Sequence, residues 1–392
     1  MLISLAYMLL LGMFLAWCCK KMRLPGLLGM IFTGILLGPY MFNLIDGSIL
    51  DISSELRRIA LIIILTRAGL SLNLADLKKV GRPAILMCFV PACFEMAGMV
   101  LLAPKLLGIT VLEAAIMGAV VAAVSPAVIV PKMIRLMEEE YGTKQGIPQM
   151  ILAGASVDDV FVIVMFTAFT GIAQGGSASA GDFVRIPVAI AAGMAAGMLI
   201  GVLLAKYFEK IHIRDTVKVA IVLSICFILV ILEDAYGTVV PFSGLIAVMG
   251  IGIALQKKRN VVAKRLSVKF NKLWVVAEIM LFVLVGATVN LNYAAAAGIA
   301  PVVLIFGVLV FRGLGVLCCV ARTPLNWKER CFCVLGYMPK ATVQAAIGGL
   351  PLAMGLQCGN IVLTVAVLAI LITAPLGAFL IDLTYRKWLS HQ

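Results

Sequence analysis

Two adjacent carboxylates, Asp158 and Asp159, have both the residue type and the position to carry chemistry. They lie inside residues 147–172, a stretch that is otherwise apolar and long enough to cross a bilayer. An ionised side chain in the middle of a membrane helix costs about 3 kcal/mol on insertion scales, so an acid there is a candidate proton relay or ion site. Successive helical residues point about 100° apart. We therefore expect one carboxylate to bind an ion while the other tunes the site or carries a second proton.

Three more charged residues fall within apolar stretches, namely Glu95, Arg312 and Lys340. A charge in such a place is costly and needs a partner. Arg67 either pairs with an acid or lies near enough to the end of its span to reach water. Glu278 is interpreted as a boundary residue, about a turn and a half inside its span.

Two of the apolar stretches contain helix breakers near their middle. One break lies at 124–127 around Pro126, and the other lies at 338–342 around Pro339. A broken membrane helix exposes carbonyl and amide groups that a cavity, an ion or a partner must satisfy. If the two broken helices cross, their like ends face each other, and Lys340 is placed to neutralise the carbonyl ends. The alternative is that these prolines only kink packed helices.

The elements that must position these residues are membrane helices. The chain is 63% hydrophobic and 13% charged, with a mean hydropathy of +1.12. Windows of about 20 apolar residues can be placed thirteen times, which predicts an all-α polytopic membrane protein with about 13 transmembrane helices. The windows begin near Leu2, Leu24, Leu56, Pro83, Val111, Ile147, Phe183, Thr216, Val240, Lys272, Gly298, Arg330 and Gly359.

The basic residues predict how these spans are oriented. Of the 32 lysines and arginines, 25 fall in every second loop or in the carboxyl-terminal segment. Basic loops stay on the cytoplasmic side, so we expect an outside amino terminus and a cytoplasmic carboxyl terminus in the cell membrane. The net charge of +13 is then a topology signal, and nucleic-acid binding is not expected.

Cysteine and histidine add no catalytic or metal-binding pattern. Adjacent pairs such as Cys18-Cys19 and Cys318-Cys319 lie in apolar runs and are interpreted as membrane-core residues. His212 and His391 fall in a loop and the tail, where a solvated side chain is the simplest interpretation. The longest polar stretch, near 256–272, is expected to be a linker helix along the cytoplasmic face.

A faint internal repeat is consistent with two halves joined by that linker. Residues 68–74 resemble residues 287–293, and each segment closes an apolar run. Glu95 and Arg312 are each the buried charge of the next span, and Pro126 and Pro339 break the span after it. The first copy begins with an inward span and the second with an outward one, so the repeats have inverted topology, which is typical of transporters.

Four strings in the sequence resemble the cation/proton antiporter superfamily, and more narrowly its NHA-type sodium/proton antiporter branch. The strings are Pro339 to Gly348, Val124 to Val128, Ala155 to Asp159 and Ile370 to Gly377, and the resemblance runs from about Leu24 to Leu383. It implies the sodium/proton antiporter fold with crossing broken helices, a single membrane transporter domain over 1–392 and a homodimer. Within that domain, a dimerisation part and an ion-carrying core would interleave and work by elevator-type alternating access.

The resemblance also implies roles for individual residues. Asp158 and Asp159 match the family's acidic pair, with Asp159 the direct cation ligand. Ser125 and Thr342 match residues at the breaks whose oxygens complete the coordination. Glu95 and Arg312 match an acid and a base that pair near the site. Many relatives outside the branch have a lysine where Arg312 stands, so their mechanism can differ.

The same function follows from elementary chemistry. Alkali cations prefer oxygen ligands, and carboxylates also accept protons, so Na+ or Li+ and H+ compete for one site. We expect a secondary-active monovalent cation/proton antiporter that needs no cofactor and is not an enzyme. A sodium-coupled organic-anion symporter of similar fold is the alternative, and an intramembrane aspartyl protease is disfavoured because its acids must come from two helices. Na+ against K+ selectivity and the stoichiometry stay open, although Arg312, which cannot release its proton, favours an electroneutral cycle.

Overall fold

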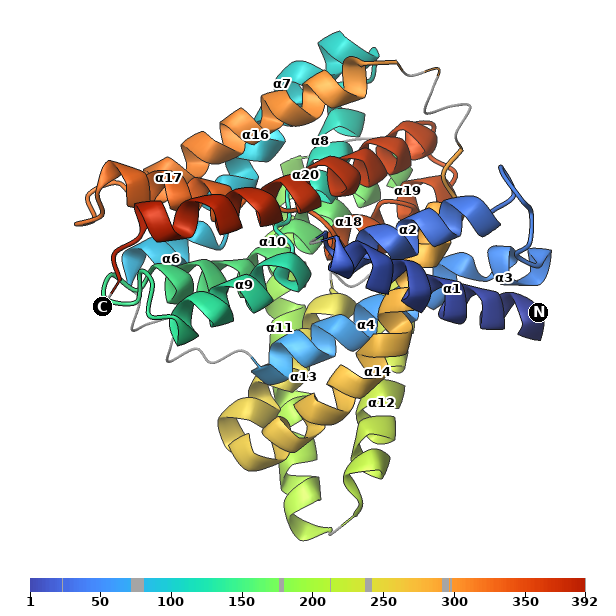
Figure 1. Cartoon of the computed structure of the whole chain (residues 1–392). Helices are drawn as coiled ribbons and strands as arrows, with labels where there is room; N and C mark the ends of the chain where they lie inside the picture. Colours follow the sequence, from blue (N-terminus) through green and yellow to red (C-terminus); the bar gives the residue numbers. More distant parts are fainter. Residues whose placement is uncertain are drawn as a thin grey trace. The chain divides into compact units, whose positions relative to one another are not determined.

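A computed structural model of the chain describes residues 1–22, 24–71, 81–175, 180–211, 213–236, 242–290, 296 and 298–391. Within the helices, the side chains of residues 156, 160, 180–187, 190 and 234 are not part of this description. Every regular element of the described residues is an α-helix (Figure 1). Nine helical stretches among them are long and apolar enough to cross a membrane, and shorter apolar helices accompany them.

The helices follow one another as α1 (Leu2–Lys21), α2 (Gly26–Leu37), α3 (Gly47–Asp51), α4 (Ser53–Ser71), α6 (Arg82–Met87), α7 (Val90–Leu107), α8 (Val111–Val121), α9 (Pro126–Glu138), α10 (Ile147–Gly175), α11 (Ala180–Lys210), α12 (Asp215–Tyr236), α13 (Gly244–Lys258), α14 (Asn260–Ala287), α16 (Ala300–Cys319), α17 (Trp327–Gly336), α18 (Thr342–Ile347), α19 (Leu350–Ala353) and α20 (Gly359–Trp388). Each of the thirteen predicted windows falls on one helix or on helices separated by a break. The predicted all-α polytopic fold is therefore confirmed.

The described chain divides into two compact units that interleave in sequence. Unit 1 comprises Met1–Ser54, Ala75–Thr170 and Leu281–Gln392, and unit 2 comprises Glu55–Leu74 and Gly171–Met280. In unit 1, α1 packs on α2, and α7 packs along α16. In unit 2, α13 packs against both α11 and α12. All the predicted site residues belong to unit 1, and the assignment of the units to dimerisation and ion carriage stays a prediction.

Two pairs of short helices in unit 1 are the broken spans. Helix α8 stops at Val121 and α9 starts at Pro126, while α17 stops at Gly336 and α18 starts at Thr342. The first helix of each pair begins with a capping box, formed by Thr110 with Glu113 in α8 and by Asn326 with Glu329 in α17. These boxes satisfy amide groups that a helix start leaves unpaired. In both halves of the predicted repeat, the broken span thus begins with a capping box and is interrupted before its second helix.

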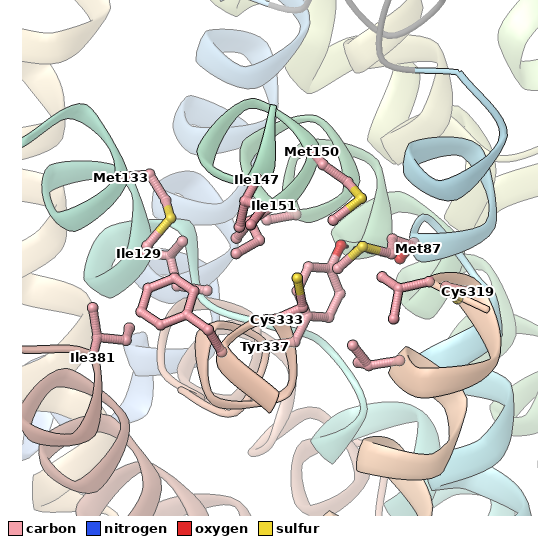
Figure 2. Close-up of a cluster of buried hydrophobic side chains, with 14 of the residues drawn as sticks. Met87, Ile129, Met133, Ile147, Met150, Ile151, Cys319, Cys333, Tyr337 and Ile381 are labelled. Atoms are coloured by element: carbon pink, nitrogen blue, oxygen red, sulfur yellow. Dashed lines mark hydrogen bonds between the residues drawn. The ribbon is translucent and has the colours of Figure 1, made fainter. Parts of the chain in front are cut away.

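A cluster of buried apolar side chains holds α9, α10, α17 and α20 together beside the breaks (Figure 2). Tyr337, at the end of α17, is fully buried in this cluster, and its hydroxyl donates to the Met87 carbonyl at 3.0 Å. Gly154 of α10 leaves the necessary room, since a Cβ there would lie 2.1 Å from Tyr337 Oη. A larger residue at Gly154 would push apart the two helices that carry Asp158 and the second break.

Several predictions concern segments outside the site. Residues 72–74 and 291–293 of the repeat, together with His212, lie outside the described residues. The polar stretch near 256–272 is helical: it ends α13 and then forms the first part of α14, which continues to Ala287. In unit 2, Arg67 of α4 is half-buried and interacts electrostatically with Glu278 of α14. Pairing with an acid was one of the two interpretations of Arg67.

Candidate functional site

The site lies where the two helix breaks of unit 1 meet. The Ser125 amide, in the first break, donates to the Pro339 carbonyl in the second at 2.8 Å. Gly377 of α20 makes room for this contact, because a Cβ there would lie 2.5 Å from Pro339 Cγ. The ends of four short helices therefore converge on one place, with the carbonyl ends of α8 and α17 and the amide ends of α9 and α18. Such ends concentrate partial charge, negative at carbonyls and positive at amides.

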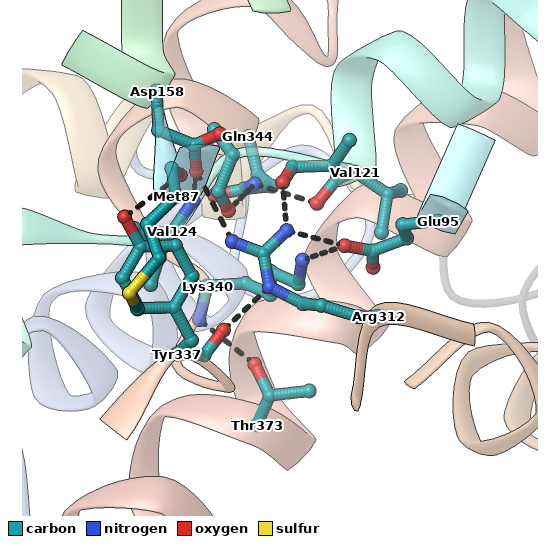
Figure 3. A network of polar contacts seen from close by, with 12 residues as sticks. Met87, Glu95, Val121, Val124, Asp158, Arg312, Tyr337, Lys340, Gln344 and Thr373 are labelled. Carbon is teal, nitrogen blue, oxygen red and sulfur yellow. Dashed lines mark hydrogen bonds and ion pairs between the residues drawn. The ribbon is translucent and has the colours of Figure 1, made fainter. Parts of the chain in front are cut away.

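Arg312, from the middle of α16, is fully buried at the centre of the polar network (Figure 3). Its guanidinium donates to two carboxylates, Glu95 Oε2 at 2.6 Å and Asp158 Oδ2 at 3.1 Å. It also donates to the carbonyl ends of both broken helices, to Ala122 in the first and to Tyr337 at 2.5 Å in the second. One planar side chain with five donors thus joins both acids to both helix ends.

Glu95, from α7, connects Arg312 to Lys340. Its Oε2 accepts from Arg312 and also from Lys340 Nζ, at 2.5 Å. All three side chains are almost entirely buried. The backbone of Lys340 is held as well, because its amide donates to Thr373 Oγ1 of α20 at 2.9 Å. The predicted contact between Glu95 and Arg312 is present, and Lys340 extends it.

The carbonyl end of α8 has a second partner, Gln344 of α18. Its Nε2 donates to the carbonyl of Val121 at 3.0 Å and to that of Ala123 at 2.8 Å. Together with Arg312, Gln344 therefore binds three consecutive carbonyl groups at the break. We expected Lys340 to neutralise the carbonyl ends, whereas these hydrogen bonds come from Arg312 and Gln344. The Lys340 ammonium instead contacts Glu95.

The two aspartates of α10 differ in their surroundings although both are buried. Asp158 Oδ2 accepts from Arg312 and, at 2.9 Å, from the Val124 amide of the first break. Asp159 is 8% exposed, and its buried Oδ1 has no hydrogen-bond partner among the described residues. The difference agrees with the helical geometry, in which neighbouring side chains point about 100° apart. One oxygen of Asp158 is bonded into the network, whereas its other oxygen and Asp159 Oδ1 are not.

Other oxygens at the breaks are also buried and unpaired in the described part of the chain. They include Ser125 Oγ, at the start of α9, Thr342 Oγ1, at the start of α18, and the second oxygen of Asp158. A buried polar group without a hydrogen bond costs about 1–3 kcal/mol, so a set of them needs a physical explanation. Oxygens of this kind are the ligands that hard monovalent cations prefer.

Sequence reasoning named seven of these residues and missed three. Asp158, Glu95, Arg312 and Lys340 form one bonded network, while Asp159, Ser125 and Thr342 supply unpaired oxygens. The missed residues are Gln344, Thr373 and Tyr337. Gln344 and Thr373 are polar residues inside apolar runs and lie within two of the strings that carry the family resemblance, which was the available signal. No group of three or more His, Cys, Asp or Glu in the described residues could hold a metal ion.

A comparison with solved structures finds the same fold in another protein. The solved sodium proton antiporter MjNhaP1 from Methanocaldococcus jannaschii at pH 8 matches with a TM-score of 0.86 and 20% sequence identity, covering 98% of this chain and 97% of that one. An electron-microscopy map of the same antiporter matches with a TM-score of 0.75 and 21% identity. The chain therefore has the fold of that antiporter.

Sequence comparison then gives the family. A model described as "Sodium/hydrogen exchanger, transmembrane" matches residues 8–386. Sodium/hydrogen exchanger 9B2 of Mus musculus is 35% identical over 382 residues, covering 92% of this chain and 68% of the mouse protein. The Homo sapiens protein of that name is 33% identical and is covered over 71% of its length. This chain belongs to the sodium/hydrogen exchanger family, so it is a multi-pass membrane transporter and not an enzyme.

Proposed function

We propose that this protein exchanges Na+ or Li+ for H+, with Asp159 as the carboxylate that binds each in turn. The observation that carries the proposal is the set of buried, unpaired oxygens of Asp159, Ser125 and Thr342 at the two helix breaks. Family membership supports sodium/proton antiport as the activity. The assignment of the ion to these particular oxygens is our own inference.

Competition at one carboxylate is sufficient for exchange. Burial favours the protonated form of a carboxyl group, and a bound cation favours its ionised form. A cation therefore binds only when the proton leaves, and a proton binds only when the cation leaves. If only loaded forms cross the membrane, inward and outward steps are coupled without further machinery.

The contacts of Asp158 support a different role for it. Arg312 and the Val124 amide both donate to Asp158, and both donors favour its carboxylate form over its acid form relative to Asp159. We propose that Asp158 holds the site's geometry and adds negative charge while Asp159 carries the proton. One proton then returns for each Na+, and the cycle moves no net charge.

The stoichiometry has a direct electrical test. A membrane potential acts on a charge-moving cycle with about 2.3 kcal/mol per charge per 100 mV. In proteoliposomes with fixed Na+ and pH gradients, a potassium-valinomycin potential should leave the Na+ flux unchanged. Acceleration or reversal of the flux with the sign of the potential would show that Asp158 also releases its proton.

Everted vesicles test the exchange itself. Addition of Na+ or Li+ to vesicles energised with an internal acid load should dequench a pH dye, and a cation series that includes K+ will define the selectivity. Asp159→Asn should abolish the signal, since an amide keeps the volume but cannot carry a proton. Asp382→Asn on α20 is the matched control, because Asp382 is exposed and pairs with Lys132. Anion uptake without proton movement would favour a sodium-coupled organic-anion symporter instead.

The remaining features are proposed on the resemblance and on the charge pattern. We propose elevator-type alternating access, a homodimer, an outside amino terminus and a cytoplasmic carboxyl terminus. A fluorescent protein that folds only in the cytoplasm should be bright when fused after the last residue, and a dark fusion would reverse the topology. Light scattering in detergent should give twice the chain mass of 41.8 kDa, and a monomer mass would contradict the dimer.

A further inference from the structure

The side-chain amide of Gln344 is hydrogen-bonded through its nitrogen, while its oxygen has no partner among the described residues. Its Nε2 donates both of its hydrogens, one to the Val121 carbonyl and one to the Ala123 carbonyl. Because both partners are acceptors, the amide has only one orientation that satisfies them. Oε1 is therefore held at a fixed position, and it is buried without a hydrogen-bond partner in the described residues. The side chain as a whole is 1% exposed.

This free oxygen lies at the helix breaks, near the unpaired oxygens of Ser125 and Thr342. Gln344 and Asp158 bind the same short segment, Gln344 through the carbonyls of Val121 and Ala123 and Asp158 through the amide of Val124 (Figure 3). Ser125 is the next residue of that segment, and Thr342 is two residues before Gln344 on α18. The unpaired oxygens of Ser125, Thr342 and Gln344 thus come from the two short segments that meet at the breaks.

We propose that Gln344 Oε1 is a neutral ligand of the transported cation and sets the selectivity among alkali cations. The inference rests on the proposed function, in which the cation binds at Asp159. An amide oxygen is a hard ligand without net charge, and it adds coordination without adding a second competing proton site. Two hydrogen bonds hold this oxygen still, so it cannot follow a change in ion radius as a mobile ligand would.

The first test removes the oxygen. Gln344→Met has similar length and no amide. In proteoliposomes at one pH, it should raise the Na+ concentration for half-maximal exchange about tenfold, which corresponds to about 1.4 kcal/mol. The maximal rate should stay within about threefold, and the ratio of the Na+ and Li+ values should change. Thr364→Val is the control, since Thr364 is buried and, among the described residues, its hydroxyl bonds only within its own helix, to the Asn360 carbonyl at 2.8 Å.

The second test keeps an oxygen, changes its charge and gives up the two hydrogen bonds that Nε2 donates. In Gln344→Glu, the ionised carboxylate has a stronger field than the amide oxygen and should shift the preference toward the smaller Li+. Selectivity is read at alkaline pH from exchange and, without any transport, from the rise in melting temperature that each cation produces in detergent. If the methionine variant does not fold, the glutamate variant decides alone.

The outcomes separate this inference from the proposed function. If Asp159→Asn keeps exchange, the proposed function is wrong. If Asp159→Asn abolishes exchange but the Gln344 variants keep both the wild-type affinity and the wild-type ratio of Na+ to Li+, only the role of Gln344 is wrong. A changed ratio in a folded variant, with Thr364→Val unchanged, supports it.

Discussion

Unit 1 contains two clusters of charged side chains that differ in their access to water. The buried network joins Glu95, Asp158, Arg312 and Lys340, each with a side chain at most 2% exposed. The exposed cluster joins the ends of α9 and α20, where Lys132 pairs with Asp382 and Arg135 pairs with Glu139 at 2.7 Å. Its side chains are 24–48% exposed.

Comparison of the two clusters shows how burial changes the energetic contribution of an ion pair. An exposed ion pair is screened by water and contributes about 0–1 kcal/mol. A buried charge has no such screening, so removing one partner leaves the other uncompensated at a cost of about 3–5 kcal/mol. The buried network contains two carboxylates and two cations, and it is therefore balanced within itself. Asp159 is not part of this balanced set. A proton or Na+ can therefore supply the positive charge that its carboxylate needs.

The largest effect is expected at Arg312, which serves four acceptors. Arg312→Gln leaves Asp158 without its hydrogen-bonded counter-ion and frees the carbonyls of Ala122 and Tyr337. We expect a loss of stability of at least about 3–5 kcal/mol, measured as a lower melting temperature in detergent. Arg312→Lys should restore only part of it, because an ammonium cannot reach four acceptors in a plane. A melting temperature equal to that of the wild type would mean that the network is not structural.

A double-mutant cycle sharpens the claim of balance. Glu95→Gln alone leaves two cations with one carboxylate in the network. Arg312→Gln alone leaves two carboxylates with one cation. The double variant retains one of each, so its loss should be smaller than the combined single losses by about 1–3 kcal/mol. Melting curves of the four proteins measure this coupling. Simple additivity would indicate that Glu95 and Arg312 do not act as a pair.

The exposed cluster should respond far less to the same kind of change. Asp382→Asn removes the carboxylate that pairs with Lys132 and approaches Arg135. Since these side chains are partly exposed, we expect a change of about 0–1 kcal/mol and normal exchange. Added salt should also lower the melting temperature of the wild type slightly more than that of Asp382→Asn, because salt screens this pair only in the wild type. A loss as large as that of Arg312→Gln would remove the distinction between the two clusters.

The smallest effect is expected from the pH dependence of Glu139. A hydrogen bond from Arg135, with a second from Tyr385, lowers the pKa of this carboxyl below its ordinary value of 4.5. A lowered pKa means that the interaction stabilises the folded state at neutral pH and is lost as the pH falls through the folded-state pKa. The difference in melting temperature between the wild type and Glu139→Gln should therefore be small at pH 7 and vanish in acid. A difference that grows in acid would have the wrong sign.

Much of the fold was predictable because the lipid solvent imposes simple rules. Apolar length predicted each of the nine described helical stretches that are long enough to cross a membrane. Proline with neighbouring small residues predicted both breaks, at 124–127 and 338–342. The charged site residues were also predictable, since a charge inside an apolar run is costly and seldom retained without a role. The pairing of Glu95 with Arg312 was implied by the family resemblance.

The distribution of hydrogen bonds could not be predicted in the same way. Which donor reaches a carbonyl end depends on the positions of four helices, and spacing along the chain does not contain that information. Lys340 was expected at those carbonyls because it lies in the break itself, yet the longer and planar Arg312 reaches both ends from α16. Gln344 and Thr373 carry no charge, so the cost of burying a charge could not identify them as site residues.

Proton release on cation binding tests the central claim most directly. Na+ is added to the detergent-solubilised protein in a weakly buffered solution, and the released protons are counted against the Na+ bound. The wild type should release about one proton per Na+ wherever Asp159 starts protonated, and the apparent affinity should weaken about tenfold per pH unit in acid. Asp159→Asn should release none, while Asp382→Asn should behave as the wild type. Undiminished proton release from Asp159→Asn would contradict the assignment of Asp159 as the shared site.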